Sequence, residues 1–144
     1  IHLELGKTHT SLRDQENAVR ELREALRTSP SDSEAAYFLG ALLTQSDGIE
    51  AGVQLLEQVL RQNPDSWGAA FYLGKARLSQ GKAAEALPLL KTASKLNPDH
   101  EAVWMQLSRA AKAAGKPADA QLALQRYESS KKARAAAQEP LVFR

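Results

Sequence analysis

Residues 67–98, with the sequence WGAAFYLGKARLSQGKAAEALPLLKTASKLNP, predict two amphipathic helices joined by a short turn. Gln80-Gly81-Lys82 provides the turn, and Asn97-Pro98 ends the second helix because proline cannot continue one. The unit recurs along the chain, since Pro30, Pro64 and Pro98 follow one another at intervals of 34 residues. A fixed period of this length is typical of proteins built from stacked repeats.

The period also holds at three other positions of the unit. These are a leucine followed by glycine or serine (Leu5-Gly6, Leu39-Gly40, Leu73-Gly74, Leu107-Ser108), a small residue (Ala18, Gly52, Ala86, Ala120) and a second leucine (Leu22, Leu56, Leu90, Leu124). Glycine inside a helix costs about 1 kcal/mol relative to alanine, so its recurrence at one position indicates a packing requirement. We therefore expect the small residues to lie where the two helices of a repeat cross.

A helix–turn–helix of this length, with leucine-glycine, small residue, leucine and proline in this order, resembles the tetratricopeptide repeat. The resemblance covers residues 1 to about 134, and Trp104 alone matches the early tryptophan of the family. It implies an all-α fold, a right-handed α-solenoid of about four repeats at approximately 1–32, 33–66, 67–100 and 101–134. A single domain would then span residues 1–139 with a long C-terminal capping helix, followed by an apolar tail at 140–144.

The expected helices cover residues 1–11, 15–28, 33–45, 49–62, a stretch ending at Ser79, 83–96, 100–113 and 117–137. Arg13-Asp14 is expected to be a turn, and Pro117 suits the first position of the last helix. In that helix we expect Leu122, Leu124 and Tyr127 to face inward. The candidate N-cap residues are Ser31 or Asp32, Asp65 or Ser66, and Asp99.

Composition and motifs exclude several kinds of site. The chain has no cysteine, which excludes disulfides and thiolate metal sites but leaves the compartment undecided. No apolar run approaches the length of a membrane span. His2, His9 and His100 form no recognised catalytic or metal-binding motif, so we predict a non-enzyme without a cofactor. Because the chain opens at Ile1 without methionine, we interpret it as a piece of a longer protein.

In this family the first helix of each repeat lines a concave groove that commonly binds peptides, so the resemblance places the candidate site there. Residues at i, i+4 and i+7 share one helix face. The candidate groove residues are Lys7, Tyr37, Phe38, Phe71, Tyr72, Lys75, Met105, Arg109 and Lys112. Two interpretations stay open for the aromatic members: they pack neighbouring first helices together, or they anchor a bound segment beside the basic residues.

These features favour a protein-interaction scaffold that binds a peptide or protein segment in the groove. Residues 1–66 hold 6 Lys/Arg against 11 Asp/Glu, and residues 67–144 hold 13 against 6. Because the basic residues are scattered among acidic ones, we interpret this imbalance first as solvated outer helix faces, and attraction of an acidic partner to the second half is the alternative. The alternatives are a regulatory or targeting segment of a larger enzyme or of a secretion or assembly protein, and, less favoured, nucleic-acid binding by the basic half. For the apolar tail we expect first that it folds back onto the stack, and the alternative is self-association through the groove of a second molecule.

Overall fold

The computed structural model describes residues 12–46 and 48–138, and every element of secondary structure within them is an α-helix. The helices are α2 (Leu12–Thr28), α3 (Ser33–Thr44), α4 (Ile49–Gln62), α5 (Trp67–Ser79), α6 (Ala83–Leu96), α7 (Glu101–Ala113) and α8 (Pro117–Gln138). The helix expected over residues 1–11 and the tail at 140–144 lie outside the described residues.

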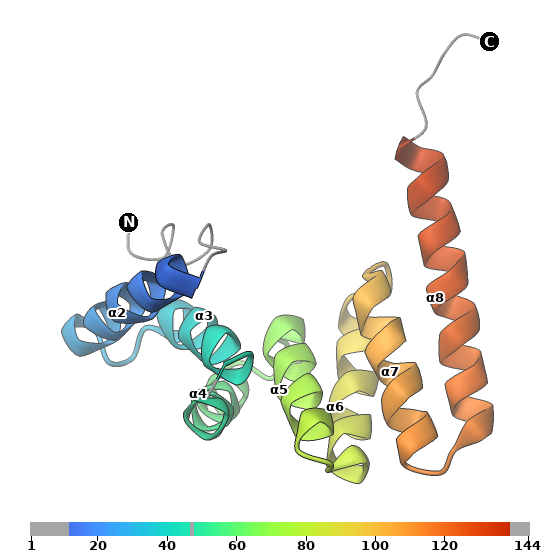
Figure 1. The fold of residues 1–144 in the computed structure, drawn as a ribbon, viewed down its shortest axis with the longest axis horizontal. Coiled ribbons are helices and arrows are strands. Elements are labelled where there is room, and N and C mark those ends of the chain that lie inside the picture. Colours follow the sequence, from blue (N-terminus) through green and yellow to red (C-terminus); the bar gives the residue numbers. More distant parts are fainter. Residues whose placement is uncertain (1–11, 47, 139–144) are drawn as a thin grey trace, which may run out of the picture.

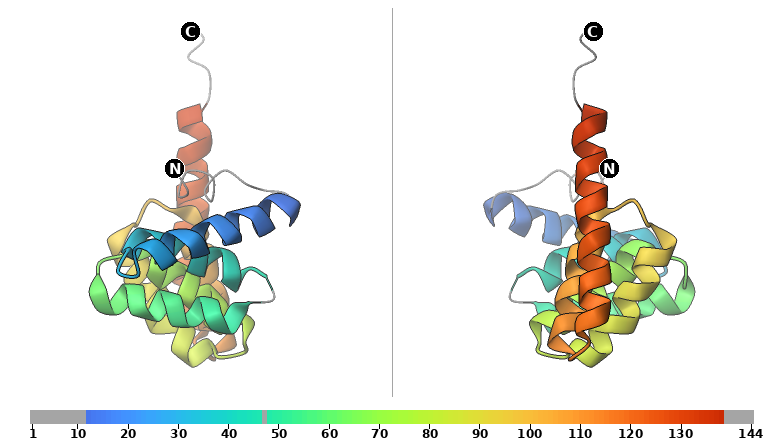
Figure 2. Two further views of the ribbon diagram at one scale, coloured as in Figure 1. Left: turned by 90° about the vertical axis from the view of Figure 1, so that its left-hand side faces the viewer. Right: turned by 90° about the vertical axis from the view of Figure 1, so that its right-hand side faces the viewer.

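The helices stack in chain order. Each packs against the next, so that they form a row from α2 to α8 (Figure 1). The first helices of successive pairs also touch, α3 contacting α5 and α5 contacting α7. The last helix, α8, projects beyond the rest of the stack toward its C-terminal end (Figure 2). This arrangement confirms the expected all-α repeat solenoid, in which each repeat is stabilised mainly by its neighbours.

The predicted caps and turns explain most helix boundaries. The side chain of Asp32 accepts a hydrogen bond from the Ala35 backbone N–H at 3.1 Å, and that of Ser66 accepts one from Ala69 at 3.3 Å. Gly81 and Gly115 end α5 and α7 with φ values of 79° and 77°, a conformation that glycine adopts readily. These contacts confirm two predicted N-caps and place the turns at the expected glycines.

Two local predictions are wrong. Arg13-Asp14 is not a turn, because α2 already begins at Leu12. Position 13 is equivalent to Gly81 and Gly115 in the 34-residue period, and a residue with a side chain resists the positive φ that those glycines adopt. Asp99 is not an N-cap either, since α7 begins one residue later than expected and its N-cap, His100, forms no side-chain capping hydrogen bond.

The repeated small residues meet where paired helices cross. A Cβ atom added to Gly52 would lie 2.8 Å from the Gly40 carbonyl oxygen, and one added to Gly74 would lie 2.7 Å from Cγ of Leu90. In the last pair, the Ser108 hydroxyl donates a hydrogen bond to the Ala120 carbonyl oxygen at 3.0 Å. The backbones therefore approach closely at each crossing, which confirms the packing role predicted for these positions.

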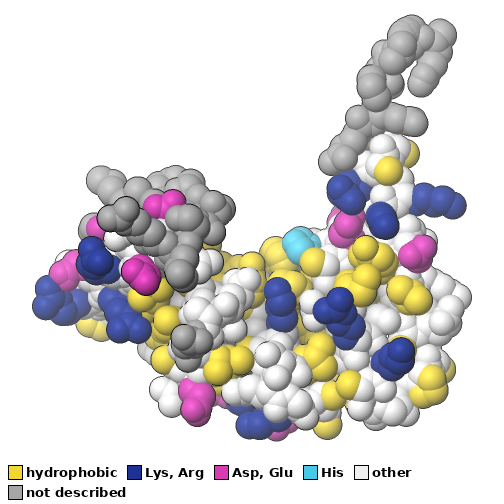
Figure 3. All heavy atoms as spheres, in the orientation of Figure 1, with side chains coloured by type: hydrophobic (Ala, Val, Ile, Leu, Met, Phe, Trp, Pro, Cys, Tyr) yellow, Lys and Arg dark blue, Asp and Glu magenta, His cyan; other side chains and the backbone are white. Residues whose placement is uncertain are grey.

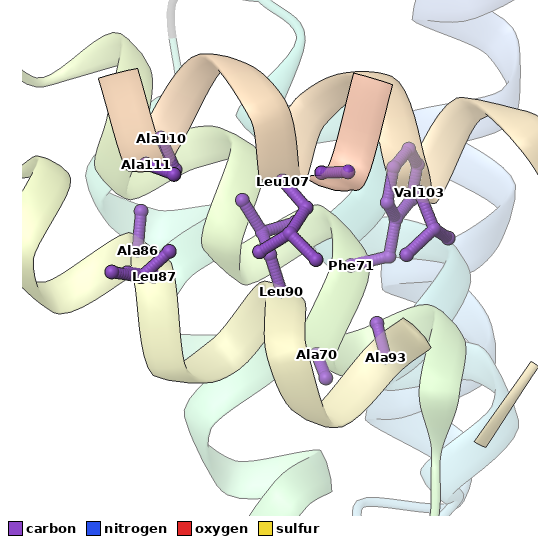
Figure 4. Close-up of a cluster of buried hydrophobic side chains, with 11 residues drawn as sticks. Ala70, Phe71, Ala86, Leu87, Leu90, Ala93, Val103, Leu107, Ala110 and Ala111 are labelled. Carbon is purple, nitrogen blue, oxygen red and sulfur yellow. The ribbon is translucent and has the colours of Figure 1, made fainter. Parts of the chain in front are cut away.

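Leucine and alanine side chains from successive repeats fill the core. Leu22, Leu56 and Leu90, which occupy one position of the period, are completely buried. In Figure 4, Leu90 of α6 lies beside Leu107 of α7, and Phe71 of α5 lies beside Val103. The core therefore runs continuously from one helix pair into the next.

The last helix departs from the sequence prediction. Leu122 and Leu124 were expected to face inward, but their exposed fractions are 61% and 37%. Among the described side chains of α8, the buried one is Ala123. Ala120 and Tyr127, three residues before it and four after it, lie on the same helix face and are partly buried. For Leu124 the prediction is wrong because the equivalent Leu22, Leu56 and Leu90 are covered by the helix pair that follows them, whereas no described helix follows α8. For Leu122 it is wrong because this position faces outward in the earlier repeats too, where it holds the exposed Arg20, Gln54 and Pro88.

Candidate protein-binding face

We call the surface formed by α3, α5 and α7 the first-helix face. A row of aromatic rings runs along it: Phe38 to Tyr37 (4.9 Å between centroids), Tyr37 to Tyr72 (6.1 Å), Tyr72 to Phe71 (5.0 Å), Phe71 to His100 (5.8 Å) and His100 to Trp67 (4.8 Å). These separations are typical of attractive ring pairs. The row therefore links α3, α5 and the start of α7.

Part of this row packs the helices together. Phe71 retains an exposed fraction of only 5%, and the Tyr37 ring lies so close to α5 that a Cβ atom on Gly68 would be 2.8 Å from Cζ of Tyr37. Burial, and secondly the neighbouring Tyr72, raises the pKa of Tyr37 to about 12. Tyr37 and Phe71 thus serve the packing role proposed for them, and the role of the row in binding stays a prediction.

Basic side chains lie beside the aromatic row. Nζ of Lys75 is 6.0 Å from the centroid of the Phe71 ring, while Arg109 and Lys112 on α7 are exposed. Within residues 12–46 and 48–138, no ion pair is formed by Lys75, Arg109 or Lys112. Figure 3 shows basic side chains among hydrophobic ones over α5 and α7. This part of the face therefore presents uncompensated positive charge next to apolar surface.

Acidic residues are scarce on the same two helices. The sequence of α5 contains no Asp or Glu, and the one acidic residue of α7 is Glu101. Glu101 is already engaged, since Arg134 of α8 donates to its carboxylate at 2.6 Å. The charge of α5 and α7 is consequently positive along the side that carries Lys75 and Arg109.

A cleft of about 700 Å³ opens between the end of α3, the start of α4 and α5. Two predicted site residues, Tyr72 and Lys75, lie in its wall. The remaining lining residues are mostly polar: Thr44, Gln45, Ser46, Ile49, Ala76, Ser79 and Gln80. The cleft thus combines one cation with hydroxyl and amide groups that can donate hydrogen bonds.

The structure brings together some of the predicted site residues. The aromatic residues of α3 and α5 and Lys75 form one connected group, whereas Met105, Arg109 and Lys112 lie further along on α7. Lys7 lies outside the described residues.

The sequence reasoning missed Trp67 and His100, which extend the aromatic row. Trp67 precedes Phe71 by one helical turn, so the i, i+4 rule already used for this face would have included it. His100 carried no such signal, because it lies outside the regular helix that follows it. In the described part of the chain, no cluster of His, Asp and Glu is suited to hold a metal, and no helix combines the length and apolarity of a membrane span.

Comparisons with known proteins agree with this architecture. Sequence profiles described as tetratricopeptide repeat match residues 1–32, 41–101 and 77–139. A crystal structure of MamA superposes with a TM-score of 0.78 at 20% identity, covering 99% of this chain and 78% of that one. A second structure, of MamA AMB-1, has a TM-score of 0.71 at 24% identity, with 89% and 75% covered.

A thermophilic tetratricopeptide repeat protein of Thermus thermophilus is also similar, with a TM-score of 0.77 at 20% identity and coverage of 91% of this chain and 73% of that one. No curated protein matches the sequence. At these identities the solved structures establish the fold alone, while the repeat profiles together span most of the chain. The chain therefore belongs to the tetratricopeptide repeat family, whose fold generally mediates protein–protein interaction.

Proposed function

We propose that this chain is a protein-interaction scaffold whose first-helix face binds an acidic segment of a partner protein. The observation that carries the proposal is the pair Lys75 and Arg109, which occupy the same position in successive repeats and form no ion pair with a described residue. Cations of this kind attract an acidic chain without first having to release a carboxylate of their own.

The surroundings of these cations support a segment that is both acidic and partly apolar. Tyr72 is half-buried beside Lys75, so its ring offers apolar surface and its hydroxyl a hydrogen bond. Aromatic and basic side chains in one patch are the residue types that dominate the energetics of protein interfaces. Phe71 contributes little direct contact because it is buried, and Tyr72 takes the place of the anchor in this proposal.

A charge-reversal experiment tests the proposal. The probe is a fluorescently labelled peptide of alternating glutamate and leucine, and its binding is followed by fluorescence anisotropy. The double variant Lys75→Glu/Arg109→Glu should weaken binding by about tenfold or more, which corresponds to about 1.4 kcal/mol. Tyr72→Ala should weaken it less, because an apolar contact is lost while the charges stay.

Two controls make the result specific to this face. Arg61→Glu reverses an exposed charge on α4 and should leave binding unchanged apart from a small long-range effect. A peptide with glutamine in place of glutamate should bind weakly. Equal binding of the two peptides, or an equal loss with Arg61→Glu, would contradict the proposal, provided that circular dichroism shows intact helices.

The same assay separates a protein partner from a nucleic acid. A labelled single-stranded oligonucleotide replaces the peptide, and its affinity is measured over a series of salt concentrations. Phosphate contacts produce a steep linear loss of affinity with the logarithm of salt concentration. Tight oligonucleotide binding with such a slope, and with the same sensitivity to the double variant, would assign the face to nucleic acid instead.

A further inference from the structure

Three departures from the repeat pattern converge at the C-terminal end of the stack. Trp104 replaces the buried Ala36 and Ala70 of the two preceding repeats. At the other two positions, Leu122 replaces Gln54 and Pro88, and Arg126 replaces Gln58 and Thr92. A large aromatic, a large apolar and a basic side chain thus stand together where the earlier repeats have small or polar ones.

These side chains line a pocket of about 320 Å³ between α6, α7 and α8. Its apolar wall includes Trp104, Leu122 and Ala123, and its polar edge consists of Lys91, Asp119 and Arg126. The pocket shares no lining residue with the cleft beside Lys75. Leu122 is the most exposed large apolar side chain in the described part of the chain, at 61%.

Trp104 is held in a fixed orientation by two contacts. Its indole N–H donates a hydrogen bond to the Pro98 carbonyl oxygen at 2.7 Å. The guanidinium carbon of Arg126 lies 4.9 Å from the centroid of its ring, on the face that favours a cation. A wall built from a fixed aromatic ring and a cation is ready to bind without rearrangement, which lowers the entropic cost of association.

The charges at the edge are unequal. Lys91 and Asp119 lie 3.8 Å apart and largely compensate each other. Arg126 forms no ion pair within residues 12–46 and 48–138, although Asp99 lines the neighbouring cleft with it. The pocket therefore offers apolar walls for one side chain and, at one side, a cation without a carboxylate partner.

We propose that this pocket is a second protein-binding site, separate from the first-helix face. It takes one apolar side chain of a partner protein, such as leucine, with an adjacent carboxylate directed at Arg126. Charge complementarity carries the choice of occupant, because a purely apolar segment would leave Arg126 without a partner at the rim. With two such sites, the chain bridges two protein segments at once.

The two tryptophans of the chain provide a direct test. In ¹⁵N-labelled protein, each gives one indole N–H signal, and the variant Trp104→Phe assigns them. The probe is the capped dipeptide acetyl-Leu-Glu-amide, with acetyl-Leu-Gln-amide and acetyl-Ala-Glu-amide as matched controls. The Leu-Glu probe should move the Trp104 signal saturably, both controls should bind at least severalfold more weakly, and the Trp67 signal should stay in place.

Variants on each side of the pocket sharpen the test. Arg126→Gln should reduce the affinity for the Leu-Glu probe to that for the Leu-Gln probe, and Leu122→Ser should weaken both. Lys75→Glu, on the first-helix face, should leave the Trp104 titration unchanged. This control distinguishes the pocket from the first-helix face, because loss of binding at one of the two sites does not require loss of binding at the other.

Three results would overturn the inference. The first is an unmoved Trp104 signal at the solubility limit of the Leu-Glu probe. The second is unaltered binding by Arg126→Gln. The third is a Trp104 signal that moves with protein concentration in the absence of any probe, because the occupant would then be a second copy of this chain.

Discussion

The interior helix pair α5–α6 and the terminal pair α7–α8 share one sequence frame but differ in their surroundings. Leu90 of α6 is completely buried, whereas the equivalent Leu124 of α8 has an exposed fraction of 37%. The difference lies in the neighbour, because α7 packs against α6 and no described helix occupies the corresponding side of α8. In a repeat protein, a residue's burial is therefore set by the next repeat as much as by its own.

The polar contacts of the two pairs differ in the same way. In the interior, Arg77 of α5 lies 2.7 Å from the carboxylate of Glu57 on α4 and 3.7 Å from that of Glu85 on α6, with 16% of its side chain exposed. At the end of the stack, Lys91 of α6 and Asp119 of α8 are 3.8 Å apart and both about half exposed. The interior contact ties three helices together, whereas the contact between Lys91 and Asp119 joins two, as does that between Glu101 of α7 and Arg134 of α8.

The largest test of this comparison is the pair of variants Leu90→Ala and Leu124→Ala. Leu90→Ala should lower the free energy of unfolding by about 2–5 kcal/mol, because it removes a fully buried side chain and leaves a cavity. Leu124→Ala should lower it by about 1 kcal/mol or less, as expected for a side chain that keeps much of its contact with water. Urea denaturation followed by circular dichroism measures both, and equal losses would refute the difference in environment.

A second test concerns the crossings within each pair. Gly74→Leu should lower the free energy of unfolding by about 1–3 kcal/mol, since the added side chain would overlap Leu90 and separate α5 from α6. Ser108→Ala should lower it by about 1 kcal/mol, because only the hydrogen bond to Ala120 is lost. An unchanged melting temperature for Gly74→Leu would mean that α5 and α6 are not closely packed at Gly74. The repeat frame, which places the crossing of the two helices there, would then be wrong.

A third test compares the polar contacts. Arg77→Met removes a cation that two carboxylates share and should lower the free energy of unfolding by about 1.5 kcal/mol. Lys91→Met breaks an exposed pair and should have an effect of about 1 kcal/mol or less, which high salt would largely abolish. Urea denaturation at several salt concentrations measures both effects. If the two variants lose the same free energy of unfolding at every salt concentration, the number of helices that an ion pair joins does not determine its contribution to stability.

The interior of the fold could be predicted from the sequence because it repeats. Pro64 and Pro98 fix where helices end, and the recurrence of Gly40 and Gly74 fixes where they cross, so each copy of the signal checks the others. Leu124 was misplaced for the converse reason: the frame gives it the inward position of Leu90, but its burial depends on a following helix that the frame cannot supply. Leu122 shares its position with the exposed Gln54 and Pro88, so the frame already indicated an outward place for it. The start of α2 could have been read from the frame, because Arg13 stands where the later repeats have the turn glycines Gly81 and Gly115.

The candidate site was predictable only in part. Helical spacing placed Tyr37 and Phe71 at equivalent positions with Tyr72 beside them, and the Tyr72 ring centroid lies 6.1 Å from that of Tyr37 and 5.0 Å from that of Phe71. It could not tell that Phe71 is buried, because exposure on this face depends on how closely α5 and α7 approach. The pocket at Trp104 could not be predicted, because its walls come from α6, α7 and α8. Periodicity within one helix does not show which residues of three different helices lie together.

The smallest and most selective test compares two joints between first helices. Tyr37 stands at the joint of α3 with α5, and Phe71 holds the equivalent position at the next joint. Burial, with a smaller contribution from Tyr72, raises the pKa of Tyr37 from 10.0 to about 12. Below about pH 10 the hydroxyl is neutral in the folded and the unfolded chain, and the full stability is present. Stability is then lost as the pH rises toward about 12, because the unfolded chain ionises first.

Tyr37→Phe should abolish this loss, since phenylalanine cannot ionise, and should change the free energy of unfolding little at neutral pH. The measurement is urea denaturation of both proteins at about pH 9 and at about pH 11. At the lower pH Tyr37 is neutral in both states, and at the higher pH it is extensively ionised only in the unfolded chain. The wild-type protein should lose more stability than the variant between these two values. An identical loss would mean that Tyr37 reaches water in the folded chain, and the joint between α3 and α5 would then be as open as the uncovered side of α8.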